Sequence, residues 1–181
     1  MKLLYCIVLV FITVCSCKHK GKNNPNACNG DTRREVKLLT DSKAALVAPV
    51  TIYTTIDSLG AIAVPEVKSS TSRLTLEYQT YTVTAKVDKV KKELDGDYHI
   101  RLINSANNYL ICEVPNANCE YATKCNYLKE YTNVRNFVEG NNLEGKIVTI
   151  TGVAFVDIDH HYARKQAKNN IELHPILHIK F

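Results

Sequence analysis

The order of extended and helical segments in the second half of this 181-residue chain restricts its fold more than any other feature. Residues 74–90 alternate polar and apolar side chains and are rich in β-branched residues, which predicts a long first strand. Turn sequences separate it from two further predicted strands, at residues 98–103 and 109–114. Pro115 is expected to end the third strand, because proline cannot donate a hydrogen bond to a sheet.

A single helical pattern follows the third strand. Apolar side chains recur at helical spacing between residues 121 and 138, with Asn118 as the expected N-cap and Gly140 as the expected C-cap. Residues 146–158 form a predicted fourth strand. Gly152 lies inside this strand, and glycine there indicates a bend or a bulge.

A fifth strand is predicted at residues 173–181. The resulting order is strand, strand, strand, helix, strand, strand. This order predicts a mainly β protein, with a five-stranded OB-fold-like barrel and one helix between strands three and four. A ferredoxin-like fold and a plain β-sandwich are weaker alternatives, because the chain has only one convincing helix and it stands at the barrel's position.

The first residues have the composition of a bacterial export signal. Lys2 is positively charged, residues 3–14 are almost uniformly apolar, and Val14-Cys15-Ser16-Cys17 follows. The apolar run is too short for a permanent membrane span, so we predict a lipoprotein signal peptide over residues 1–16. The four-residue motif resembles a bacterial lipobox, which implies that Cys17 carries the lipid. An ordinary cleaved signal peptide and an uncleaved anchor are the alternatives.

Lipid attachment at Cys17 implies a membrane-anchored protein of the bacterial cell envelope. Lys18 stands where an inner-membrane retention signal has aspartate, so we expect the outer membrane. Residues 17–31 are rich in Lys, Asn and Gly and are predicted to form a flexible tether. Residues 32–72 are predicted to be an extended N-terminal segment, and residues 73–181 the barrel domain.

Four cysteines remain after the predicted signal peptide and lipid site are set aside, and an oxidising compartment would allow them to pair. They are Cys28, Cys112, Cys119 and Cys125. Four cysteines allow three complete pairings, and the sequence does not select one. Cys112 alternates with apolar strand residues and could be a buried thiol, whereas Cys119 and Cys125 are close enough in sequence for a local bridge.

Acids and histidines gather near the ends of the predicted strands. They are Asp97, His99, Glu113, Asp157, His160, Glu172 and His174. Strand parity places four of them, His99, Glu113, Asp157 and His174, on the outer face of the barrel. Imidazole combined with carboxylate suits zinc, iron or manganese better than calcium, so these four could bind a divalent metal. General acid–base chemistry and a purely structural hydrogen-bonded network are the other interpretations.

Tyrosines mark the first three predicted strands, where OB-folds stack bases or sugars. They are Tyr78, Tyr81, Tyr98 and Tyr109. We expect them to be half-buried strand residues, which strands favour, and the alternative is a surface that binds nucleic acid or an oligosaccharide. The formal charge of +5 falls to +4 once Lys2 is removed, which is not by itself the signature of a nucleic-acid-binding protein.

Four motifs together resemble an uncharacterised family of small secreted bacterial proteins. They are Asp95-Gly96-Asp97-Tyr98-His99, Glu113-Val114-Pro115 followed by Cys119, Gly152-Val153-Ala154-Phe155-Val156-Asp157 with His160, and Glu172-Leu173-His174-Pro175. The resemblance runs from Arg73 to the C-terminus and implies an OB-like fold without an established activity. The family's Gly-rich loop after His160 is absent here. A fainter similarity, to the calcium-dependent thermonucleases, lacks that family's arginine-bearing segments.

The sequence therefore predicts a monomeric, lipid-anchored ligand-binding or interaction module of the cell envelope, with an unidentified ligand. The alternative is a metal-dependent hydrolase of the phosphodiesterase or nuclease type. It would use the carboxylates of Asp97, Glu113 and Asp157 with the imidazoles of His99 and His174. The sequence does not decide whether the protein is an enzyme.

Overall fold

The computed structural model describes residues 33–161 and 163–181. The predicted signal peptide, the tether, Cys17 and Cys28 lie outside these residues. Within the described part, no helix combines the length and the apolar character that crossing a membrane requires.

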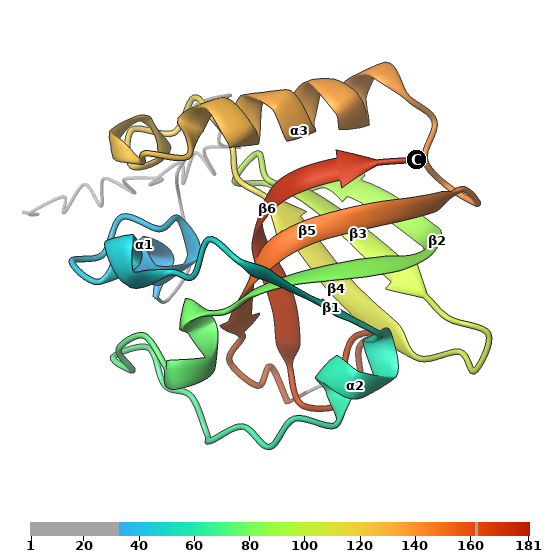
Figure 1. Ribbon diagram of the computed structural model, residues 1–181, viewed down its shortest axis with the longest axis horizontal. Helices are drawn as coiled ribbons and strands as arrows, with labels where there is room; N and C mark the ends of the chain where they lie inside the picture. Colours follow the sequence, from blue (N-terminus) through green and yellow to red (C-terminus); the bar gives the residue numbers. More distant parts are fainter. Residues whose placement is uncertain (1–32, 162) are drawn as a thin grey trace, which may run out of the picture.

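Five of the described strands close into a barrel (Figure 1). They are β2 (Thr80–Lys92), β3 (Tyr98–Ile103), β4 (Tyr109–Val114), β5 (Ile147–Val156) and β6 (Ile171–Lys180). The barrel runs β2-β3-β4-β6-β5 and returns to β2, with β4 and β6 parallel and the other pairs antiparallel. This strand order is that of an OB-fold, so the predicted fold is confirmed.

Strand β2 closes the barrel because it is long enough to pair with two strands. Its first part pairs with β5 between Thr80 and Lys86, and its second part pairs with β3 between Lys86 and Lys92. The predicted first strand began too early, since Thr75–Tyr78 forms a 3-10 helix. Burial of Glu77 explains the difference, because its carboxylate accepts a hydrogen bond from the backbone N–H of Leu74 and fixes this turn.

Helix α3 (Leu128–Gly140) lies across one end of the barrel (Figure 1). It buries Tyr131, Val134 and Val138 against the core. The predicted helix between strands three and four is confirmed, but it begins at Leu128 and Asn118 does not cap it. The preceding residues form a loop with one short 3-10 helix, and the buried side chains of this loop hold it against the core.

The described N-terminal segment contains α1 (Arg34–Lys37), β1 (Thr51–Thr54) and α2 (Ile56–Gly60). Strand β1 adds a sixth strand to the sheet by pairing parallel with the start of β2. Leu38 and Leu59 from this segment are fully buried and join the hydrophobic core. The segment therefore packs onto the barrel instead of only leading to it.

A buried ion pair fixes the first described residue to the barrel. The Arg33 guanidinium donates to both carboxylate oxygens of Glu77, at 2.9 and 2.5 Å, and both side chains are fully buried. Arg33 also donates to the backbone oxygen of Val156 at the end of β5. The pair thus joins the N-terminal segment, the 3-10 helix before β2, and β5.

The close approach of β5 and β6 at Gly152 requires glycine. A Cβ there would lie 2.9 Å from the backbone oxygen of Pro175, and register shifts flank the position, which confirms the predicted irregularity. Between Gly152 and Ala154 on β5, the partner on β6 moves from Ile176 to Leu173. Each of the two register shifts places one extra residue in β6, and Ile176 lies between them with its side chain in the core.

The cysteine arrangement corrects one prediction. Cys112 is a buried free thiol, as its alternation indicated. Cys125 is also buried and free, and Cys119 is disulfide-bonded. A local bridge between Cys119 and Cys125 is therefore wrong, because the Cys125 thiol instead packs beside the hydroxyl of Tyr131, 3.3 Å away.

Candidate functional site

A groove of about 660 Å³ runs over the outer face of β2, β3 and β4, between the β2–β3 loop and the β5–β6 loop. We call it the barrel-face groove. Its cationic lining consists of Lys37, Lys89, Lys91, Arg101, Arg164 and Lys165. Its acidic lining consists of Glu93, Asp95, Glu113 and Asp157. Cations outnumber acids by two, so the groove is mixed in charge with a positive excess.

Two lysines supply this excess. Lys91 pairs with Glu93 at 2.7 Å, and Arg101 and Arg164 also contact carboxylates. Among the described residues, Lys89 and Lys165 form no ion pair. The ammonium of Lys165 instead lies 5.3 Å from the ring centre of Tyr109. These two ammonium groups are the ones in the groove that an anion could reach without first breaking a salt bridge.

Glu113 links this groove to the protein interior. His99 and Glu113 face each other across β3 and β4, and His99 Nδ1 lies 2.8 Å from Glu113 Oε1. The second carboxylate oxygen, Oε2, lies 3.2 Å from Nδ1 of the buried His174 on β6. Burial would raise the pKa of Glu113, but its contacts with His174 and His99 hold the pKa well below its usual range.

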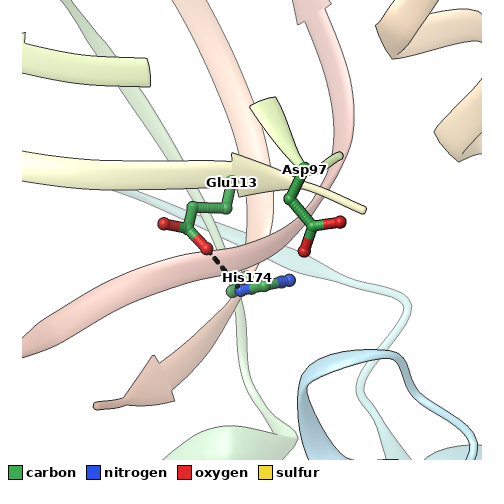
Figure 2. A group of neighbouring side chains, drawn as sticks. All are labelled: Asp97, Glu113 and His174. Carbon is green, nitrogen blue, oxygen red and sulfur yellow. Dashed lines mark ion pairs between the residues drawn. The ribbon is translucent and has the colours of Figure 1, made fainter. Parts of the chain in front are cut away.

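Asp97 completes an inner cluster with Glu113 and His174 (Figure 2). One ligand atom from each of these residues lies within 4.8 Å of the others. Burial raises the pKa of Asp97 to about 6. Asp97 Oδ1 accepts a hydrogen bond of 2.7 Å from the backbone N–H of Asn116, which fixes its carboxylate towards His174. We call Asp97, Glu113 and His174 the inner cluster.

The turn before Asp97 depends on Gly96. This residue has φ of +88°, and a Cβ on it would lie 2.6 Å from the side-chain nitrogen of Asn116. Glycine avoids both the unfavourable backbone conformation and the overlap. The Asp-Gly-Asp sequence therefore places the second aspartate next to the barrel interior.

The remaining predicted site residues lie beside the inner cluster without joining it. Asp157 contacts His160 at 2.9 Å and Arg164 at 3.4 Å in the β5–β6 loop. Glu172 is fully buried, and its Oε2 has no hydrogen-bond partner among the described residues. Burial, together with the charges of Glu113 and Asp157, raises the pKa of Glu172 well above its usual range. Strand parity predicted that Asp157 would lie beside His174, but the carboxylate there is that of Asp97.

The N-terminal segment covers the outward-facing side chains that parity placed on an open surface. Lys37 of α1 lies 4.0 Å from Glu113 Oε2 and 5.2 Å from the ring centre of Phe155. The Phe155 ring in turn packs against the His174 ring, with centres 6.0 Å apart. Sequence reasoning missed Lys37, Lys89 and Lys165, because nothing in the local pattern of a lysine shows which surface it will join.

The four tyrosines do not form an open stacking surface. All four are half-buried, and Tyr78 lies in the 3-10 helix before β2. The Tyr98 ring lies 4.6 Å from the guanidinium of Arg135, and its hydroxyl donates to Glu139 on α3. Only Tyr109 approaches the groove, through Lys165 and Arg101.

Comparison with known proteins assigns no family to this chain. No family model matches the chain, and no curated protein matches it. Among solved structures, the asparaginyl-tRNA synthetase of Entamoeba histolytica is similar, with 13% sequence identity and a TM-score of 0.42. The match covers 74% of this chain and 24% of that chain.

Proposed function

We propose that this protein is a lipid-anchored ligand-binding module of the bacterial cell envelope, and that its barrel-face groove binds a phosphate-bearing chain such as a short single-stranded oligonucleotide. The observation that carries the proposal is the positive excess of the groove, with Lys89 and Lys165 outside any described ion pair. OB-folds bind oligonucleotides and oligosaccharides on this face, between the two loops that bound the groove here.

The geometry favours recognition of phosphates over stacking of bases. The four tyrosines are half-buried, so they offer little ring surface to a ligand. Lysine ammonium groups, in contrast, pair with phosphates of any sequence and release counterions as they do so. Binding should therefore tolerate changes of base and weaken as salt rises. Neutralisation of two phosphates predicts a slope of about −1.4 for log K against log salt on a single strand.

Fluorescence anisotropy with a labelled oligothymidylate of about twelve nucleotides tests this proposal, in salt from about 50 to about 200 mM. We expect salt-dependent binding that the double variant Lys89→Glu with Lys165→Glu abolishes. The matched control is Lys68→Glu, because Lys68 is exposed and does not line the groove. No binding at low salt, or an equal loss per substitution in the control, would contradict the proposal.

The anchoring part of the proposal depends on Cys17. Its support is the short apolar run followed by Val14-Cys15-Ser16-Cys17. In membrane fractionation of a bacterial host, we expect the protein in the membrane pellet and Cys17→Ser in the soluble fraction or unprocessed. Cys6→Ser is the control, because Cys6 lies within the predicted apolar run and should be removed with it. Unchanged fractionation and mass of Cys17→Ser would count against a lipid at this residue.

A metal-dependent hydrolase of the phosphodiesterase type is the second candidate, and the His99–Glu113 pair on the groove lining favours it. An imidazole whose Nδ1 is held by a carboxylate is a common arrangement for a general base. Release of nitrophenol from bis(p-nitrophenyl) phosphate measures this activity. Turnover should disappear in His99→Gln and persist in His160→Gln, whereas a rate that is the same in both variants would exclude His99 as the base.

A further inference from the structure

The inner cluster has the composition of a metal site and lies just inside the barrel-face groove. From the distances among Asp97, Glu113 and His174, and from the unsatisfied imidazole of His174, we infer that these three residues bind one divalent transition-metal ion, with zinc as the preferred ion. This inference does not depend on the ligand proposed for the groove.

The imidazole of His174 provides the first argument. The residue is 1% exposed, and its Nδ1 has only the 3.2 Å ion-pair contact with Glu113, without hydrogen-bond geometry. Its Nε2 has no hydrogen-bond partner among the described residues. Buried polar groups in folded proteins are nearly always satisfied, so this imidazole indicates a missing partner. Figure 2 shows the carboxylates of Glu113 and Asp97 on the same side of the His174 ring, which is seen nearly edge-on.

The spacing provides the second argument. A tetrahedral ion with oxygen and nitrogen ligands at about 2.1 Å separates those ligands by about 3.4 Å. Glu113 Oε2 and His174 Nδ1 are already 3.2 Å apart. The three ligand atoms lie within 4.8 Å of one another, so the widest possible separation must close by about 1.4 Å, which is within reach of small side-chain rotations.

The surrounding contacts hold the proposed ligands in place. The backbone N–H of Asn116 donates to Asp97 at 2.7 Å, and His99 binds the outer oxygen of Glu113 at 2.8 Å. Partners of this kind orient the ligands of metal sites and raise metal affinity. The Lys37 ammonium contacts Glu113 at 4.0 Å and places one positive charge beside the two carboxylates.

The donor set selects the class of ion. Calcium prefers six to eight oxygen ligands, whereas this cluster offers two carboxylates and one imidazole. Zinc accepts this mixture and commonly takes three protein ligands with a water in the fourth position. Manganese and iron(II) accept similar ligands and are therefore the competing ions.

Titration of the full, untagged, metal-depleted chain with zinc tests this inference, with elemental analysis after dialysis. We expect one zinc per chain, and cobalt(II) in its place should give the visible absorption of a tetrahedral site. Asp97→Asn and His174→Gln should each weaken zinc binding by at least about a hundredfold, and His99→Gln by about ten- to a hundredfold, since His99 only orients Glu113.

His160→Gln is the matched control, because His160 contacts Asp157 outside the inner cluster and should leave zinc affinity unchanged. Circular dichroism identifies variants that fail to fold, and Glu113→Gln then replaces whichever of Asp97→Asn and His174→Gln is unfolded. Absence of stoichiometric zinc in the parent chain would overturn the inference. Zinc binding that survives in folded Asp97→Asn and His174→Gln, or that is lost in His160→Gln, would overturn it as well. Oligonucleotide binding by the same samples is measured separately, so either proposal can fail alone.

Discussion

Replacement of Glu77 by glutamine tests how strongly the N-terminal segment is fixed to the barrel. Four N–H groups donate to the two carboxylate oxygens of Glu77: two from the Arg33 guanidinium, and the backbone N–H groups of Val156 and Leu74. An amide has only one oxygen, so in either orientation two of the four donors face the NH₂ group. Arg33 also becomes a buried charge without a counterion, because both side chains of the pair are fully buried.

Removal of one partner of a buried pair costs about 3–5 kcal/mol of unfolding free energy. At about 2–4 °C per kcal/mol for a protein of this size, Glu77→Gln should lower the melting temperature by about 6–20 °C. Thermal unfolding followed by circular dichroism measures the shift, and urea unfolding gives the free energy directly.

Asp88→Asn supplies the matched control, since Asp88 pairs with Arg101 at 2.5 Å but both side chains are partly exposed, at 26% and 22%. Asp88→Asn should lower the unfolding free energy by about 0–1 kcal/mol, and so the melting temperature by less than about 4 °C. If Glu77→Gln and Asp88→Asn shift the melting temperature equally, the buried pair does not hold the segment in the way described above.

Three other substitutions give separate outcomes. Glu172→Gln should raise the melting temperature at about pH 7.5, because burial disfavours the charged carboxylate and an amide carries no charge; a lower melting temperature would contradict this reasoning. Burial raises the pKa of Asp97 from 3.8 to about 6. Between about pH 4 and about pH 6 the folded chain therefore holds a proton that the unfolded chain has lost. The contribution of Asp97 to the unfolding free energy should fall as pH rises through this range. Urea unfolding of metal-free Asp97→Asn should lack that contribution, and an unchanged pH profile would refute it. Gly96→Ala should lower the free energy of urea unfolding by about 1–3 kcal/mol, and by more than Gly145→Ala does. Both glycines have positive φ, but a Cβ would overlap a neighbouring atom only at Gly96.

The strands bounded by strong turn residues were predictable from sequence alone. Residues 98–103 and 109–114 form β3 and β4 with the predicted bounds. Asp95-Gly96 precedes the first of them and Pro115 follows the second, and these residues limit strands through their own backbone geometry. Local chemistry therefore decided both boundaries.

Elements set by distant contacts were not predictable. The 3-10 helix at Thr75–Tyr78 follows sequence that favours a strand, and the carboxylate that fixes it is paired with Arg33, 44 residues earlier. Alternation also placed Glu113 and His174 on an open outer face. They are buried because α1 covers that face, and no periodicity in β4 or β6 could reveal this.

The candidate site was partly predictable for the same reason. Cross-strand pairing of β3 and β4 brings His99 to Glu113, as strand parity indicated. The two extra residues in β6 beside Gly152 break simple alternation along that strand. Asp97 reaches the inner cluster from a turn, where strand parity does not apply.

The ion pair between Arg33 and Glu77 determines where this protein can be shortened. The apparent start of the barrel at Arg73 is an attractive place to begin a truncated form for crystallisation or expression. Such a form would leave the Glu77 carboxylate without the Arg33 guanidinium. It would also expose the ring of Phe155, against which Arg33 and Lys37 pack. A fragment intended to keep the native barrel should therefore begin upstream of Arg33.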